Sequence, residues 1–154
     1  APATVAAPAA AFARWPPPGC SPSLCWAALQ WLSQRDALRE CHDAGQHAST
    51  TFRAEWYDAS RDVSLVSCWP HTGRTHQIRV HFKHVGFPLI GDTMYGTKAT
   101  AQLASDTGVH AERQMLHALH LSFTHPRSGE RKSFEAAWPG DFEATLNALR
   151  AAGG

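Results

Sequence analysis

Hydrophobic and polar residues alternate in two separate pairs of short segments, and this pattern constrains the fold of the chain more than any other feature. In the first pair, Phe52, Ala54 and Trp56 are separated by charged residues, and a second apolar segment at 63–69 follows a polar turn. A period of two residues is typical of a half-buried strand, because successive side chains point to opposite faces of a sheet. The two segments are therefore predicted to form a β-hairpin.

The second pair of segments predicts another hairpin, closer to the C-terminal end. Its alternating apolar residues are Leu119, Leu121 and Phe123, followed by Phe134, Ala136 and Trp138. Between them, the sequence Pro-Arg-Ser-Gly at 126–129 supplies residues that favour a turn. Two hairpins predict a sheet in which neighbouring strands are mostly antiparallel.

Two further segments show the spacing of amphipathic helices. From Leu24 to about Ala44, apolar residues recur near every third or fourth position, and Gly45 would end the helix. From Asp141 to Arg150, the apolar residues again fall on one face. Together with the hairpins, these helices predict an α+β fold in which helices flank a mixed, mostly antiparallel sheet.

Composition divides the chain into an N-terminal arm, a helical segment and a larger folded part. Residues 1–19 are almost entirely alanine and proline, with Arg14 as the only charged residue. Three consecutive prolines disfavour both helix and sheet, so this arm is expected to be extended. The predicted helical segment occupies 20–45, and the folded part occupies 46–150.

Charge and cysteine content limit the classes of function. The chain of 154 residues has a net charge of only +1, so affinity for nucleic acid would require local clustering of basic residues. Its four cysteines form no Cys-x-x-Cys pair, which favours free thiols in a reducing compartment. No apolar run approaches the roughly 20 residues that span a membrane. We therefore expect an intracellular protein without a membrane partner, cytoplasmic or, because no acid precedes Asp36, mitochondrial.

The segment HTGRTHQIRVH at 71–81 combines two arginines and three histidines without an acidic residue. The spacing of its apolar residues fits a strand and a helix equally well. Its ends favour a helix over 75–85, because Thr75 is a good N-terminal cap and Gly86 is a good residue to follow the last turn.

In either conformation, Arg79 and Lys83 would point in the same direction. No Asp or Glu lies between 63 and 91 to neutralise these two residues or Arg74, so a local positive patch is predicted. The nearby histidines match no common spacing of zinc ligands, and no carboxylate lies among them. No metal ion is therefore expected.

At 70–96, the sequence PHTGRTHQIRVHFKHVGFPLIGDTMYG resembles the signature region of the RluA-type RNA pseudouridine synthases. The family pattern runs TGRTHQIRVH, then G-x-P-[IL]-x-GD, then YG. Matches continue downstream in order, at Arg113, Leu116-His117-Ala118, Leu121, Phe123, His125-Pro126, Phe134, Ala136, Pro139 and Asp141-Phe142. The resemblance covers about 46–149.

The resemblance implies a mixed sheet with flanking helices and a central cleft that accepts a uridine flipped out of RNA. In the family an aspartate is the nucleophile, and neither a metal ion nor an organic cofactor is implied. Arg79 matches the family arginine that pairs with that aspartate and keeps it ionised and oriented. By analogy, the residues that contact the RNA backbone are Arg74, His76, Gln77 and Lys83. The implied partners are RNA, either ribosomal or transfer RNA, and ribosomal or assembly proteins.

One part of the family pattern has no counterpart in the chain. The nucleophile of the family lies in a block like HRLDxxTSG, and the nearest imitation, Arg35-Asp36, lacks the residues that should follow. Asp36 is therefore interpreted as a helix-surface acid, and Arg79 would lack its partner. The chain resembles the C-terminal half of the catalytic domain.

Two hypotheses about function follow. The first is an RNA pseudouridine synthase of which this is an incomplete or divergent chain, inactive by itself. The second is a non-catalytic RNA-binding or ribosome-associated protein that keeps the same sheet, cleft and basic patch.

Overall fold

The computed structural model describes residues 24–30, 37–43 and 46–151, and the predicted N-terminal arm lies outside them. The described strands are β1 (Leu24–Gln30), β2 (Ala37–Asp43), β3 (Gln46–Asp58), β4 (Val63–Pro70), β5 (Leu116–Thr124) and β6 (Arg131–Glu135). The described helices are α1 (Gln77–His84), α2 (Thr97–Thr107) and α3 (Gly140–Ala151). None of these helices is long and apolar enough to cross a membrane.

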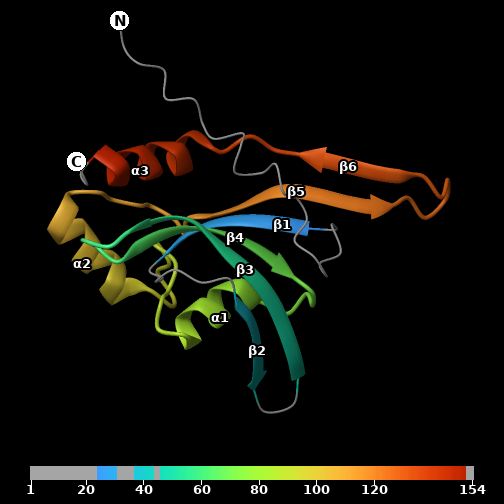
Figure 1. Cartoon of the computed structure of the whole chain (residues 1–154), viewed down its shortest axis with the longest axis horizontal. Coiled ribbons are helices and arrows are strands. Elements are labelled where there is room, and N and C mark those ends of the chain that lie inside the picture. The colour runs from blue at the N-terminus through green and yellow to red at the C-terminus, as the bar shows by residue number, and fades with distance from the viewer. Residues whose placement is uncertain (1–23, 31–36, 44–45, 152–154) are drawn as a thin grey trace, which may run out of the picture.

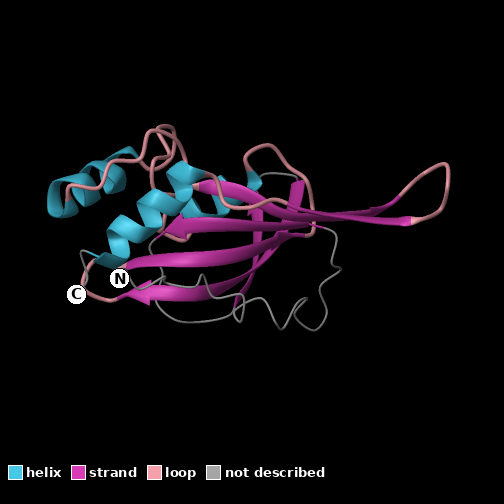
Figure 2. Cartoon of the chain, turned by 90° about the horizontal axis from the view of Figure 1, so that it is seen from above, coloured by secondary structure: helices cyan, strands magenta, loops and turns pink. Residues whose placement is uncertain are grey.

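The described strands form one sheet in the order β2-β3-β4-β1-β5-β6, and each pair of neighbours is antiparallel (Figure 1). β3 and β4 form the first predicted hairpin, and β5 and β6 form the second. Figure 2 shows the β5–β6 hairpin extending beyond the other strands. The predicted α+β class with a mostly antiparallel sheet is confirmed.

The helix predicted between Leu24 and Ala44 is wrong, because this segment contains the strands β1 and β2. β1 lies between β4 and β5 and pairs with both, and β2 pairs with β3 along its whole length. A short apolar run such as LCWAALQ fits a central strand as well as a helix. Pairing with strands that are distant in the sequence decides between the two.

Alternate residues of β4 point to opposite faces of the sheet, and each face carries its own hydrophobic core. On one face, Val63 and Leu65 pack with Phe142, Leu146 and Leu149 of α3. All three of these α3 side chains are fully buried. The predicted C-terminal helix and its apolar face are therefore confirmed.

The opposite face of the sheet carries α1. Here Val66 and Cys68 of β4 pack with Phe52 of β3 and with Ile78 and Phe82 of α1. Cys68 is fully buried in this core. This packing fixes α1 beneath the end of β4 and so determines where the cationic segment lies.

The helix predicted over 75–85 is confirmed, but its N-terminal end differs from the prediction. The cap residue is His76 rather than Thr75, and its backbone is left-handed, with φ of 53°. At the other end, Val85 caps the helix, and Gly86 follows with φ of 90°, as expected for a residue after the last turn.

Candidate functional site

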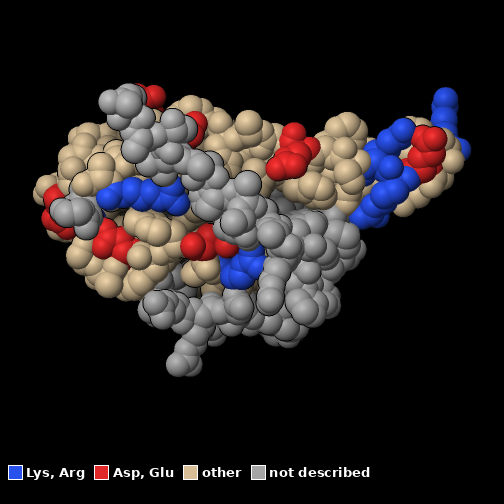
Figure 3. All heavy atoms as spheres, turned by 45° about the horizontal axis from the view of Figure 1, so that its top comes forward, with Lys and Arg blue, Asp and Glu red and all other residues tan. Residues whose placement is uncertain are grey.

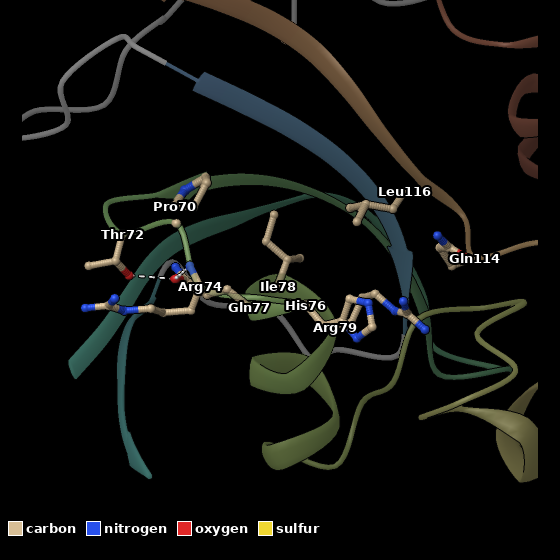
Figure 4. A pocket seen from close by; sticks show the side chains of 10 residues that line it. Pro70, Thr72, Arg74, His76, Gln77, Ile78, Arg79, Gln114 and Leu116 are labelled. Atoms are coloured by element: carbon tan, nitrogen blue, oxygen red, sulfur yellow. Dashed lines mark hydrogen bonds between the residues drawn. The ribbon is translucent and has the colours of Figure 1, made fainter. Parts of the chain in front are cut away.

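An open pocket of about 410 Å³ lies where the end of β4, the start of α1 and the segment before β5 meet (Figure 4). Pro70, Ile78 and Leu116 supply its apolar side chains. Four of the five predicted site residues also line it: Arg74, His76, Gln77 and Arg79. The fifth, Lys83, is exposed further along α1 and does not line the pocket.

Gln77 is buried and makes every hydrogen bond that its amide can make. Its Nε2 donates to the carbonyl oxygen of Ser49 (2.9 Å) and to Oγ1 of Thr50 (3.0 Å). Its Oε1 accepts from Oγ1 of Thr72 (2.6 Å) and from the amide of Arg74 (3.1 Å). Two donors and two acceptor positions exhaust a primary amide.

Gln77 therefore has no hydrogen-bonding group left for a ligand, and the predicted contact between Gln77 and RNA does not fit this geometry. Its bonds instead tie the turn before α1 to β3. The amide of His71 donates to the same Ser49 carbonyl at 2.9 Å, and the amide of Ser49 donates to Oγ1 of Thr72 at 3.0 Å. The rim of the pocket is thus bonded to the sheet.

Arg79 is paired with Asp92, an acid that the sequence analysis did not assign to it. Nε of Arg79 donates to Oδ2 of Asp92 at 2.7 Å, and Nη2 donates to Oδ1 at 2.8 Å. The expectation of an arginine without a carboxylate partner is therefore wrong. The acid-free interval of 63–91 ends one residue before Asp92. The loop after α1 folds back so that Asp92 lies beside Arg79 of that helix.

Both members of this pair are charged at neutral pH. Burial by itself raises the pKa of Asp92, but hydrogen bonds from Arg79 and from the amides of Tyr95 and Met94 outweigh burial and lower the pKa below its ordinary value. The hydrogen bond to Asp92 raises the pKa of Arg79. The positive patch is accordingly weaker than predicted, because Asp92 neutralises one of its three members.

Tyr95 connects this pair to the rest of the cationic segment. The carbon of the Arg79 guanidinium lies 5.0 Å from the centre of the Tyr95 ring, and Nζ of Lys83 lies 5.9 Å from it. Arg79 and Lys83 therefore point in the same direction, as predicted. The Tyr95 hydroxyl is 3.2 Å from Nδ1 of His76, which places His76 at the same ring.

The loop that carries Asp92 and Tyr95 lies between two glycines that it requires. Gly91 has φ of 75°, and a Cβ there would collide with the backbone carbonyl of Arg113. A Cβ on Gly96 would lie 2.7 Å from the carbonyl oxygen of Leu89. Both positions therefore exclude larger residues. The amides of Met94 and Tyr95 both donate to Oδ1 of Asp92 at 3.0 Å, which closes the turn between the two glycines.

The exposed basic residues differ from Arg79 in how they are held. Arg74 is exposed, and its Nε lies 3.4 Å from the carbonyl oxygen of His47. On the face drawn in Figure 3, acidic and basic side chains are interspersed, and basic ones gather on the β5–β6 hairpin. Arg127, Arg131 and Lys132 are the basic residues of this hairpin, which the sequence analysis did not single out.

No group of three metal-ligating side chains occurs among the residues that the structure describes. His81 is buried within α1, and burial, followed by the nearby charge of His84, lowers its pKa. The pocket side chains are amide, guanidinium, imidazole, hydroxyl and hydrocarbon groups. Such a surface can bind a planar base and an anionic group together.

A family model described as RNA pseudouridylate synthase matches residues 28–84. The match begins within β1 and so includes residues 28–45, upstream of the 46–149 over which the sequence motifs show the resemblance. The matched region contains the turn before α1, all of α1 and each predicted site residue.

Several curated proteins are similar to the chain. An uncharacterized RNA pseudouridine synthase of Chloroflexus aurantiacus is 41% identical over 106 residues, which are 69% of this chain and 31% of that protein. Ribosomal large subunit pseudouridine synthase D of Nitrosomonas europaea is 43% identical over 107 residues, 69% and 30% of the two chains. Ribosomal large subunit pseudouridine synthase C of Salmonella typhimurium is 39% identical over 119 residues, 77% and 37% of the two chains.

Solved structures share the fold at lower identity. Human RNA pseudouridylate synthase domain containing 4 superimposes with a TM-score of 0.61 at 20% identity, covering 82% of this chain and 62% of that one. Human RNA pseudouridylate synthase domain containing 1 gives 0.60 at 20% identity, with 84% and 65% covered. The chain spans about a third of the length of the curated relatives named above.

Proposed function

Because this chain belongs to the RNA pseudouridine synthase family of the RluA, RluC and RluD type, we propose that the protein isomerises uridine to pseudouridine in RNA. The observation that carries this proposal is the pocket built around the TGRTHQIR block, with Arg79 held at its wall. The pocket volume lies in the range of small-molecule sites.

In the proposed reaction the pocket receives a uridine flipped out of the RNA. Flipping costs a few kcal/mol of lost stacking and pairing. The apolar side chains of Pro70, Ile78 and Leu116 offset part of this by packing on the base. A nucleophilic aspartate then attacks C1′ of the ribose, and the glycosidic bond to N1 of the base breaks. The base turns, its C5 bonds to C1′ and displaces the aspartate, and C5 loses its proton while N1 gains one.

We propose that Arg79 orients this aspartate, which the chain does not supply in a recognisable HRLD block. An arginine beside a buried carboxylate keeps the carboxylate ionised, as Arg79 does for Asp92 in this structure. The relatives are about three times as long as the matched part, so the aspartate would come from a region outside it.

Arg74, His76 and Lys83 are proposed to contact RNA phosphates. Arg74 and Lys83 are exposed, and His76 lies between them beside the pocket. Two of the relatives named above are synthases of the large ribosomal subunit, which supports ribosomal rather than transfer RNA as the substrate. Ribosomal or assembly proteins would then be its neighbours, in the compartment where ribosomes form.

The test is to incubate the full-length protein with large-subunit ribosomal RNA and to map pseudouridine by its chemical adducts. Pseudouridine at a defined position, absent after Arg79→Ala, would support the proposal. Binding of the RNA without any pseudouridine would refute it and favour the non-catalytic RNA-binding protein. Reading the gene upstream of this segment would show independently whether an HRLD block exists.

A further inference from the structure

Two of the three guanidinium nitrogens of Arg79 have a hydrogen-bond partner in the part of the chain that the structure describes. Nε and Nη2 are both bonded to Asp92, and no described residue accepts a hydrogen bond from Nη1. Arg79 also lines the pocket, where Figure 4 shows its guanidinium extending from α1 in the direction of Gln114. The Nη1 edge is therefore the part of Arg79 that remains for a group entering the site.

The carboxylate of Asp92, which is bonded to Nε and Nη2 of Arg79, is itself held in place by the backbone. The side chain of Asp92 is 0% exposed, and its oxygens accept from Arg79 and from the amides of Met94 and Tyr95, the last two at 3.0 Å. A carboxylate bonded to two backbone amides takes its position from the loop and not from the arginine.

The loop itself is fixed at both ends. Gly91 donates its amide to Oγ1 of Thr100 at 2.9 Å, and the amide of Gly96 donates to the carbonyl oxygen of Asp92 at 2.8 Å. At the two glycines the loop also lies close to the backbone of Arg113 and of Leu89. The position of Asp92 is thus set by the fold before any ligand binds.

Stability alone is a weak reason for such a pair. A buried arginine–carboxylate pair is often no more stabilising than apolar side chains of similar volume, because both charges must leave water. Its distinct contribution is directional, since two parallel hydrogen bonds fix the plane and the rotation of a guanidinium. The Tyr95 ring, 5.0 Å from the guanidinium carbon, restricts the remaining movement.

We propose that Asp92 and Tyr95 are positioning residues that hold Arg79 with its Nη1 edge presented to the pocket, where it meets the nucleophilic carboxylate. This inference rests on the proposed function. It implies that the nucleophile contacts only Nη1 of an arginine that is already oriented. A bidentate ion pair between the nucleophile and Arg79 would not form as the RNA binds. Arg79 would then need no rearrangement during the reaction.

The test uses the full-length protein, its ribosomal RNA substrate and the variant Asp92→Asn. Asparagine keeps an oxygen for the amides of Met94 and Tyr95 but loses the charge that fixes Arg79. We expect kcat to fall about 10- to 100-fold, as is typical when the partner that orients a functional group is lost. The dissociation constant for RNA and its dependence on salt should stay unchanged, because the RNA contacts remain.

Glu55→Gln is the matched control, because Glu55 pairs with Arg53 on β3 outside the pocket lining and should tolerate the same neutralisation without loss of kcat. Tyr95→Leu removes the ring that contacts Arg79 and Lys83 and the hydroxyl that lies 3.2 Å from Nδ1 of His76. It should lower kcat by the same mechanism, and Tyr95→Phe, which loses only the hydroxyl, should keep kcat. If Asp92→Asn fails to fold, Tyr95→Leu tests the inference in its place, and a lower kcat with an unchanged dissociation constant for RNA would support it.

A folded Asp92→Asn variant with unchanged kcat would overturn the inference and leave the proposed function standing. Weaker RNA binding with a flatter salt dependence would also overturn it, since Arg79 would then be a phosphate contact. An unmodified protein that forms no pseudouridine would refute the proposed function, and this inference with it.

Discussion

Arg113 and Asp141 are 28 residues apart in the sequence, and two hydrogen bonds of 2.6 and 2.8 Å join their side chains. Nη1 of Arg113 also donates to the carbonyl oxygens of Gln114 and Leu116, whose side chains line the pocket. The ion pair therefore connects the first turn of α3 to the wall of the candidate site.

This pair predicts a specific dependence of stability on pH. The hydrogen bond from Arg113 lowers the pKa of Asp141 below its ordinary value of 3.8. Its stabilising effect should therefore be complete above about pH 4 and be lost as the pH falls through the lowered pKa. Thermal unfolding should show that Asp141→Asn is less stable than the unmodified protein at pH 7 and that the difference disappears in acid. Glu143→Gln, on the same helix, should leave the thermal stability unchanged both at pH 7 and in acid.

Arg79→Met should destabilise the protein, contrary to what an arginine without a partner would predict. Asp92 would keep a fully buried carboxylate without its cation, which costs about 3–5 kcal/mol. The free energy of unfolding can be measured by urea denaturation. The double variant R79M/D92N should recover part of the loss, because no buried charge remains. Equal stability of Arg79→Met and the unmodified protein would show that the pair contributes nothing to the fold.

Gln77→Met should weaken the fold rather than the RNA contacts. Methionine has a similar length but leaves the hydroxyl of Thr50 without its donor and the hydroxyl of Thr72 and the amide of Arg74 without their acceptor. An unsatisfied buried group costs about 1–3 kcal/mol. Urea denaturation should detect the loss, while binding of RNA by the folded fraction stays the same. Weaker binding without loss of stability would restore Gln77 as a ligand-contacting residue.

Lys83→Ala should weaken RNA binding for all sequences. A phosphate contact releases counterions, so its removal should flatten the plot of log affinity against log salt by about 0.7 for single-stranded RNA. Arg79→Met should hardly alter this slope, because Arg79 is bonded to Asp92 at the pocket wall and is not proposed to contact a phosphate. Equal changes in slope from the two variants would mean that Arg79 is simply another phosphate contact.

The chain of 154 residues, purified without further sequence, should form no pseudouridine in ribosomal RNA. No block within it matches the HRLD pattern of the family nucleophile. Pseudouridine can be measured by chemical mapping of the treated RNA. Turnover that disappears in Asp36→Ala would instead identify Asp36 as the nucleophile.

The hairpins and α3 could be predicted because their patterns are local. Alternation in β3 and in the β5–β6 pair, and the apolar face of α3, arise from residues that are close in the sequence. β1 could not be predicted this way, since its strand conformation depends on pairing with both β4 and β5. α2 was missed because only Leu103 in it is buried, so it lacks an apolar face to read.

The candidate site shows the same division. The four predicted site residues that line the pocket, Arg74, His76, Gln77 and Arg79, were found from one continuous block. The pairing of Arg79 with Asp92 was missed, because it depends on a loop conformation that two glycines and a backbone approach determine. The saturation of Gln77 was missed for a related reason, since its partners Ser49 and Thr50 lie on another strand.

Among the described strands, β6 has a neighbour on one side only, and all of its residues are exposed. An unpaired strand edge can recruit the same strand of another copy and start aggregation. β6 carries Arg131, Lys132 and Glu135, and charged side chains at such an edge disfavour pairing with an identical strand, because they would have to give up water. The basic hairpin thus protects the molecule from its own open edge.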